Sequence, residues 1–135
     1  MRHVRDVSLA VLFVAAALVL TAGTAQAQDP VKVAPKNFKV LLDNEHVRVL
    51  EFHSNAGEKI PMHSHPAYTI YSFAAGKTKY TSPTGETSER EMQAGQAVWR
   101  DAESHASEFM GPGEAHSLLI EMKGKPHMKT PAKKK

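Results

Sequence analysis

Turn signals recur along residues 38–122 at intervals of about 8–12 residues, which leaves only short segments between them. Each segment is rich in β-branched, aromatic or other apolar residues, and no window after the first 27 residues keeps the 3.6-residue period of an amphipathic helix. A Pro-Thr-Gly-Glu sequence at 83–86 also predicts a β-hairpin. The chain is therefore predicted to be all-β, as a sandwich or barrel. The predicted strands include 46–52, 68–75, 96–100, 104–110 and 115–122.

The first 27 residues differ in character from the rest of the chain. Arg2 and Arg5 precede a continuously apolar run over residues 9–20, and small residues follow, ending at Ala27. A membrane-spanning helix needs about 20 apolar residues, so this run is short for an anchor. The pattern is typical of a secretory signal peptide over residues 1–27, cut after Ala27. It predicts a secreted or periplasmic protein with no stable membrane anchor after cleavage.

The remaining chain divides by composition into a lead-in at 28–37, the predicted β domain at 38–122 and a tail at 123–135. The tail carries six lysines and no acidic residue, and it is predicted to be disordered. Without interleaved aromatic residues it is a weak nucleic-acid signal, so we expect a solubilising end and no nucleic-acid partner. The absence of cysteine removes disulfides, thiol catalysis and cysteine-type zinc sites.

Two histidines, His63 and His65, lie two residues apart between Pro61 and Pro66. Residues i and i+2 of a strand point to the same face, so these imidazoles can converge on one ion. Iron, manganese, zinc, nickel and copper all accept imidazole nitrogen. The alternative is a pair of ordinary strand histidines, so a third ligand is needed. We interpret the other isolated histidines as surface or core residues, namely His46, His53 and His127.

Glycines and histidines stand at defined spacing on both sides of the His63–His65 pair, namely Gly57, His63, His65 and Gly76 in a first group and Gly95 and His105 in a second. Their spacing resembles the two signature motifs of the cupins, and the resemblance covers roughly residues 38–122. It implies a single double-stranded β-helix, or jelly-roll, barrel with a metal held by His63, His65 and His105.

The sequence departs from the cupin pattern at several positions. The metal-binding glutamate of the first motif falls on Thr69, while the proline and glycine of the second fall on Arg100 and Ala102 and its asparagine on Phe109. Thr69 shares strand parity with His65, so we expect its side chain to point at the ion. A neutral hydroxyl is a poor ligand, which would leave a coordination position open. The alternative is a cupin that has lost its metal or fills the pocket with side chains.

Other residues near the motifs are candidates for supporting roles. Glu103 and Glu108 flank the third histidine, but neither stands at the ligand position of the family. Tyr71 and Phe73 are predicted to line the pocket if the strand is regular. His116, on the last strand, either faces the interior near the site or caps the core. Because an enzyme needs a positioned acid or base, His116 and Tyr71 are the candidate catalytic residues.

The sequence thus predicts an exported cupin that binds one divalent metal, namely iron, manganese, zinc, nickel or copper. Three neutral imidazoles leave coordination positions for water, O₂ or a small acid or diol. The resemblance implies a metal-dependent oxygenase or isomerase of a small molecule. The alternative is a non-catalytic periplasmic module that binds a metal or small ligand. A homodimer is compatible with the resemblance.

Overall fold

The computed structural model describes residues 28–124 of the 135-residue chain. The predicted signal peptide lies outside the described residues, as does the predicted tail beyond residue 124, so both stay predictions. No helix within residues 28–124 is long and apolar enough to cross a membrane.

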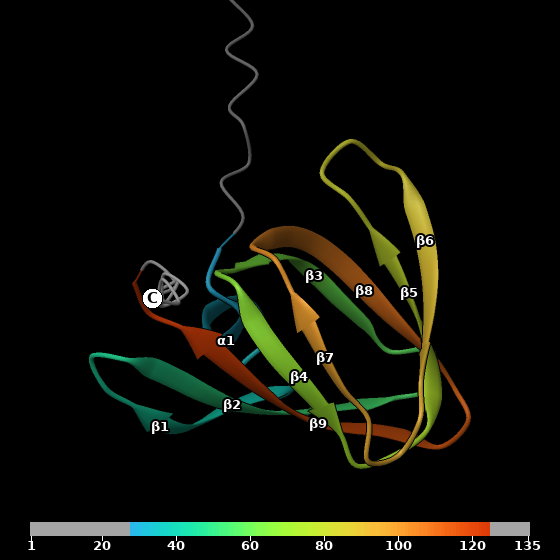
Figure 1. The fold of residues 1–135 in the computed structure, drawn as a ribbon. Helices are drawn as coiled ribbons and strands as arrows, with labels where there is room; N and C mark the ends of the chain where they lie inside the picture. The colour runs from blue at the N-terminus through green and yellow to red at the C-terminus, as the bar shows by residue number, and fades with distance from the viewer. Residues whose placement is uncertain (1–27, 125–135) are drawn as a thin grey trace, which may run out of the picture.

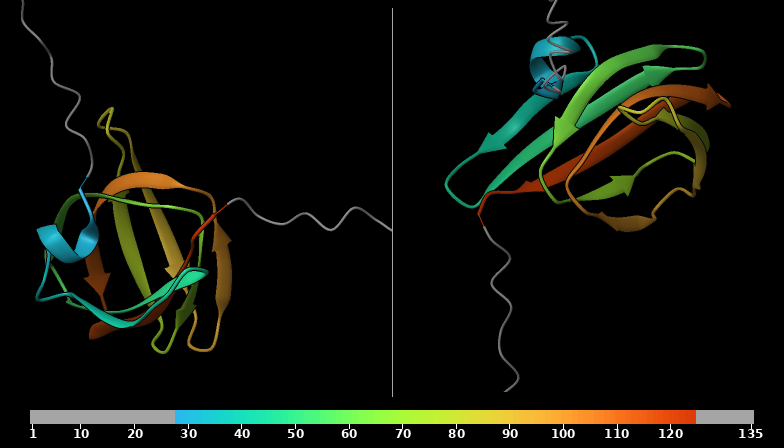
Figure 2. Two further views of the ribbon diagram at one scale, coloured as in Figure 1. Left: turned by 90° about the vertical axis from the view of Figure 1, so that its left-hand side faces the viewer. Right: turned by 90° about the horizontal axis from the view of Figure 1, so that it is seen from above.

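Two antiparallel sheets curve around a common interior (Figures 1 and 2). The five-stranded sheet has the order β1-β2-β9-β4-β7, and the four-stranded sheet has the order β3-β8-β5-β6. The predicted all-β barrel is confirmed. The strands are β1 (Phe38–Asp43), β2 (Val47–Asn55), β3 (Lys59–His65), β4 (Tyr68–Ser72), β5 (Gly76–Thr81), β6 (Thr87–Met92), β7 (Ala97–Arg100), β8 (Glu103–Gly111) and β9 (Glu114–Met122).

The lead-in contains one short helix, α1 (Pro30–Val33), which packs against β1 and β3. Asp29 caps it, because its side chain accepts a hydrogen bond from the Val31 backbone N–H at 2.9 Å, and Pro30 suits the first helical position. A four-residue helix is too short to show a hydrophobic period, which is why the sequence pattern did not reveal it.

The core lies between the sheets and reaches the base of the histidine pair. Phe38, Leu50, Ile60 and Leu119 are all nearly inaccessible to solvent. The Phe38 ring lies 5.4 Å from the His63 ring, centroid to centroid, in an edge-on arrangement. The Phe38 side chain from β1 therefore connects the apolar core to this imidazole.

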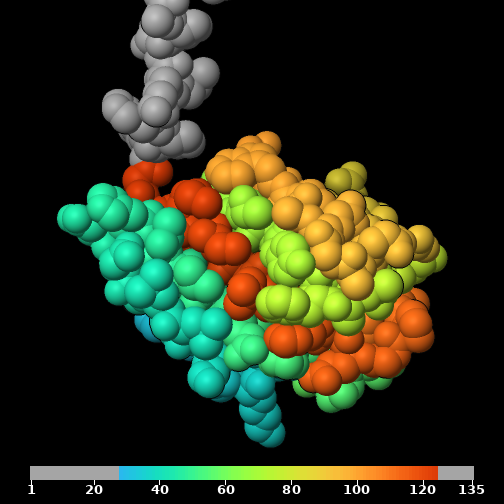
Figure 3. All heavy atoms as spheres, turned by 60° about the horizontal axis from the view of Figure 1, so that its bottom comes forward, coloured from blue at the N-terminus to red at the C-terminus, as the bar shows by residue number. Residues whose placement is uncertain are grey.

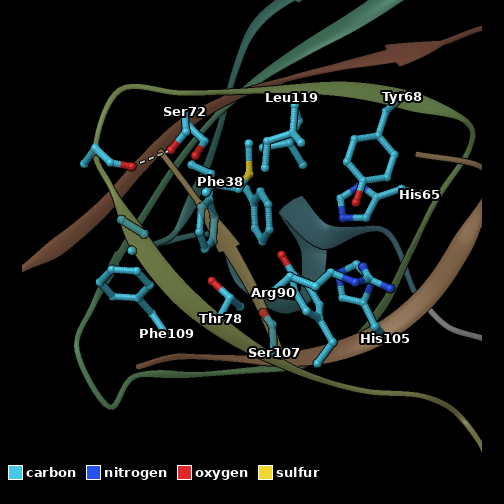
Figure 4. A pocket seen from close by; sticks show the side chains of 18 of the residues that line it. Phe38, His65, Tyr68, Ser72, Thr78, Arg90, His105, Ser107, Phe109 and Leu119 are labelled. Carbon is cyan, nitrogen blue, oxygen red and sulfur yellow. Dashed lines mark hydrogen bonds between the residues drawn. The ribbon is translucent and has the colours of Figure 1, made fainter. Parts of the chain in front are cut away.

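The glycine of the first motif has a steric role. A Cβ at Gly76 would lie 2.5 Å from the Phe109 ring, closer than carbon atoms can approach. Phe109 stands where the second motif has its asparagine, and its buried ring closes the end of the interior away from the histidines (Figure 4). The glycine at 76 is therefore required by the aromatic residue at 109.

Candidate metal centre

The three predicted ligands meet inside the barrel. His63 and His65 project from β3, and His105 lies directly opposite His63 in the β3–β8 ladder. The three residues are 1%, 4% and 6% exposed. One ligand atom from each lies within 4.8 Å of the others, and the His63 ring centroid is 4.9 Å from that of His65 and 4.7 Å from that of His105. The structure thus brings together residues 42 positions apart into a group that could hold a metal ion.

A bulge sets the local geometry of β3. Between the pairs Ile60↔Ser107 and His63↔His105, β3 advances three residues while β8 advances two. Pro61 lies in this bulge, one of the few places in a sheet where proline is tolerated, because it has no backbone N–H to donate. The Pro61 carbonyl accepts a hydrogen bond from His63 Nδ1 at 2.7 Å. The proline that interrupts the ladder therefore also orients the first imidazole.

The Nδ1 atoms of all three imidazoles face acceptors. His65 Nδ1 lies 2.6 Å from Glu121 Oε1, a hydrogen-bond distance, while His105 Nδ1 lies 3.5 Å from Glu103 Oε1 without forming a hydrogen bond. Metal-bound histidines characteristically donate their other ring N–H to a carboxylate or backbone carbonyl, which fixes the tautomer and the ring orientation. With Nδ1 hydrogen-bonded in this way, Nε2 is the nitrogen that the His63 and His65 rings have free for an ion. The buried triad therefore fits a divalent metal.

Glu121 links the His65 imidazole to the N-terminal lead-in. Its side chain is almost fully buried and also accepts a hydrogen bond from Arg48 Nε at 2.6 Å, while the Arg48 guanidinium reaches Asp29. Burial alone would raise the pKa of Glu121, but the hydrogen bonds from His65 and Arg48 hold this pKa below its usual range. Glu121 is therefore a carboxylate, as a strong acceptor for the imidazole N–H must be.

His63 is held in its neutral form. Burial lowers its pKa to about 4, and the neighbouring imidazoles act in the same direction. A metal binds only the unprotonated ring nitrogen, so protons do not compete with an ion for His63 near neutral pH.

Glu103 is the centre of a second polar network beside the site. Its carboxylate accepts hydrogen bonds from the Tyr68 hydroxyl at 2.7 Å and from Arg100 Nη2 at 2.9 Å. Burial alone would raise the pKa of Glu103, but His105, Arg100 and Tyr68 together hold this pKa far below its usual range. Burial raises the pKa of Tyr68, and the Glu103 carboxylate raises it further. Glu103 therefore stays ionised and Tyr68 stays protonated.

The triad lies at one end of a cavity of about 60 Å³. Figure 4 shows His65, Tyr68 and His105 together at this end, with Phe109 at the other. The lining combines aromatic and aliphatic side chains with imidazole, hydroxyl and guanidinium groups, so the cavity suits a small ligand that carries polar groups. Tyr80, Arg90 and His105 also line a neighbouring open depression, which makes them the border between the cavity and solvent.

Arg90, on β6, is the one strongly basic side chain among the residues that line the cavity. Its Nη1 atom is buried and forms no hydrogen bond with any residue in 28–124, although it makes an ion pair with Glu103 Oε2 at 3.5 Å. The guanidinium carbon lies 4.6 Å from the Tyr80 ring centroid, which holds the group in place by a cation–π contact. A guanidinium with an unused donor at a cavity wall is suited to an anion.

The predicted orientation of β4 is wrong. Tyr68, Ile70 and Ser72 line the cavity, whereas Tyr71 and the following Phe73 are 36% and 45% exposed on the outer face. Thr69 shares that outward parity and does not line the cavity. The reason is that the chain passes from one sheet to the other between β3 and β4, so strand parity does not carry across.

The structure shows neither of the two placements considered for His116, which were facing the interior near the site and capping the core. Ser117 and Leu119 line the cavity from β9, so His116 lies on the outer face of the sheet, where its Nε2 is 3.1 Å from Glu51 Oε1. Tyr71 and His116 therefore both lie outside the barrel and cannot supply acid or base to an ion held by the triad. Glu108, the other acid weighed near His105, is not among the cavity-lining residues.

Sequence analysis missed three residues around the site: Glu121, Tyr68 and Arg90. Glu121 had a weak signal, because a lone acid in an otherwise apolar last strand needs a buried partner. Tyr68 and Arg90 had none, since their roles depend on partners from other strands.

The chain is similar to a cupin domain from Bordetella pertussis Tohama I, with a TM-score of 0.59 and 24% identity over 64% of this chain and 92% of that chain. It is similar to a double-stranded β-helix protein from Klebsiella pneumoniae, with a TM-score of 0.52 and 21% identity over 65% and 76%. A cupin protein from Bacteroides fragilis gives 0.51 and 20% over 69% and 81%.

No protein-family model and no curated protein matches the sequence. Identities this low bear on the fold alone, so the assignment of chemistry rests on the side chains described above.

Proposed function

Because the chain has the cupin fold, with three buried histidines whose Nδ1 atoms face acceptors, we propose that it is a metal-dependent oxygenase of a small organic anion. The proposal rests on the convergence of His63, His65 and His105, together with the neighbouring acceptors that orient their rings. The metal would supply Lewis-acid or redox chemistry at its open coordination positions. The borderline metals iron, manganese, zinc, nickel and copper all suit imidazole, and iron, manganese or copper would support O₂ chemistry.

The residues of the chain bind and orient the ligand. Arg90 pairs with a carboxylate through its unused donor, which places the rest of a small acid toward the triad. The apolar side chains of Phe38, Phe52 and Leu119 exclude water from the part of the ligand that is not bound by Arg90 or the triad. The cavity volume of about 60 Å³ favours a chelating acid of a few non-hydrogen atoms.

The titratable groups at the site favour an oxygenase over an isomerase. An isomerase that moves a proton needs a base with a pKa near neutrality. Tyr68 has a raised pKa, and Glu103 is committed to three neighbours and has a strongly lowered pKa. Within residues 28–124, the cavity lining offers no carboxylate. The same observation is compatible with a non-catalytic binding module, which the turnover experiment separates.

Metal binding is tested by calorimetric titration of the chelator-treated protein. We expect one high-affinity equivalent in the parent, and a loss of affinity of more than about 100-fold in His105→Ala, because removing a ligand costs more than removing a supporting partner. His46→Ala is the matched control, since His46 is exposed beside Glu45. Equal affinity in parent and His105→Ala would exclude His105 as a ligand.

Anion binding and turnover are tested next, on metal-loaded protein. Oxalate is a suitable probe of the bidentate-acid class, and Arg90→Gln should weaken it roughly 10- to 100-fold, the usual worth of charged hydrogen bonds. Lys77→Gln is the control, because it removes an exposed cation from β5 without changing the cavity lining. O₂ consumption with a panel of chelating acids then decides function: uptake supports the oxygenase, and binding without uptake supports the binding module.

Export is a further part of the proposal. The composition of residues 1–27 supports cleavage after Ala27. Intact-mass measurement of the secreted or periplasmic protein should give a chain that starts at Gln28, and a full-length mass from a membrane fraction would contradict it.

A further inference from the structure

A second group of histidine and glutamate side chains lies on the outer face of the five-stranded sheet. Glu51 and His53 are two residues apart on β2, and His116 lies directly opposite His53 in the β2–β9 ladder. Their neighbours Phe52 and Ser117 line the inner cavity, so alternation places these three on the outside. Figure 3 shows this face, with β1 and β2, β9, β4 and β7 side by side.

The ligand atoms of this group already converge on one point. Glu51 Oε1 lies 3.1 Å from His116 Nε2 and 3.5 Å from His53 Nε2, and ligand atoms of the three residues lie within 4.8 Å of one another. A tetrahedral zinc ion with bonds of 2.0–2.2 Å separates its ligand atoms by about 3.4 Å. An ion therefore fits between the three side chains with only small rotations.

Neighbouring side chains hold the two imidazoles in place. His53 Nδ1 lies 2.8 Å from Glu114 Oε1, so its N–H is donated to this carboxylate and Nε2 is left toward Glu51. The His53 and His116 rings stack with centroids 4.1 Å apart and planes 18° apart. Phe73 packs against His116 with a centroid distance of 4.5 Å. The carboxylate–histidine pair repeats on the surface the arrangement that Glu121 gives His65 inside the barrel.

We propose that Glu51, His53 and His116 form a second site for a borderline divalent cation such as Zn²⁺, Ni²⁺ or Cu²⁺, with Glu114 as a positioning residue. Two imidazoles and one carboxylate are a ligand set that these ions accept. The side chains of Glu51, His53 and His116 are 27%, 41% and 35% exposed, so the remaining coordination positions open to solvent. The site binds more weakly than the triad and exchanges its ion faster. The proposal does not depend on the function proposed for the inner cavity.

The test is Zn²⁺ titration of the chelator-treated, purified protein, with His127→Gln in every variant so that the histidine of the predicted tail does not contribute. We expect two equivalents of different affinity. His53→Gln and His116→Gln should each abolish the weaker equivalent and leave the tighter one unchanged. Glu114→Gln should weaken it about 10-fold, as expected for the loss of a supporting carboxylate.

The matched control is His46→Gln, which removes an exposed histidine that contacts Glu45 and belongs to no group of ligand side chains within residues 28–124. It should keep both equivalents. As a readout independent of stoichiometry, the ring-proton NMR signals of His53 and His116 should shift with the second equivalent. One equivalent in the parent, or two unchanged equivalents in both His53→Gln and His116→Gln, would overturn the proposal and leave the group as a cross-strand network of histidine–glutamate contacts.

Discussion

Each face of β9 carries a glutamate that hydrogen-bonds a histidine of a neighbouring segment, and one of these pairs is buried while the other is exposed. Inside, Glu121 supports His65 in a nearly dry environment, while outside, Glu114 supports His53 with about half of each side chain exposed. Both carboxylates accept a histidine N–H at a similar distance, 2.6 Å and 2.8 Å. Because the two distances are similar, we expect burial, more than hydrogen-bond length, to decide how strongly each pair is coupled to the stability of the fold.

The largest expected effect is on the inner carboxylate. Glu121→Ala should lower the free energy of unfolding by about 3–5 kcal/mol, because it leaves the buried Arg48 charge without its main partner. Glu114→Ala should lower it by less than about 1 kcal/mol, as for exposed ion pairs. Urea unfolding of both variants in the presence of chelator measures the difference. Equal losses of unfolding free energy would show that burial does not distinguish the two glutamate–histidine pairs.

The second effect concerns pH and His63 in the metal-free protein. The folded-state pKa of about 4 lies below the usual 6.5, so the unfolded chain binds the proton more readily between these values. Stability should therefore fall by about 3 kcal/mol as pH drops from 6.5 to 4, and this contribution should not change further below pH 4.

Urea unfolding between pH 7 and pH 4 checks this, with chelator present. Both His63→Gln and His63→Leu remove the imidazole, so in both variants the free energy of unfolding should depend less on pH in this range, whatever its value at pH 7. The same slope in all three proteins would show that His63 is not the titrating group.

A smaller effect is expected at the tyrosine beside the triad. Tyr68→Phe removes the hydrogen bond to Glu103 and should cost about 1 kcal/mol, because Arg100 still satisfies the carboxylate. Tyr71→Phe, on the outer face of the same strand, should change stability by less than about 0.5 kcal/mol. Thermal and urea unfolding of the pair compare the two faces of β4 directly.

The smallest effect is expected at Thr69. Because Thr69 faces away from the cavity, Thr69→Glu should change the affinity of the triad for metal by less than about 2-fold. Calorimetric titration of the variant beside the parent is sufficient. A strong gain in affinity would mean that this side chain reaches the ion, and would restore the original alignment of the first motif.

The sequence could predict the features that depend on neighbouring residues of one strand, and it could not predict those that depend on residues far apart in the chain. The His63–His65 pair is visible because two residues of one strand share a face whatever the rest of the fold does. His105 needed the cupin resemblance, since its partner lies across a ladder. The predicted orientation of Tyr71 was wrong because the alternation of side chains does not continue where the chain passes from one sheet to the other, as it does after Pro66. Glu121 is 56 positions from His65, and no local pattern connects them.

The bulge at Pro61 makes the length of β3 part of the site. Deleting Met62 would even out the spacing between Ile60↔Ser107 and His63↔His105, and so give a more regular ladder. It would also shorten the distance in sequence between His63 and the Pro61 carbonyl that accepts its Nδ1–H bond, while Ile60 and His63, which already share the inner face, would stay on that face. The extra residue of the bulge therefore orients the His63 imidazole and does not select the face from which it projects.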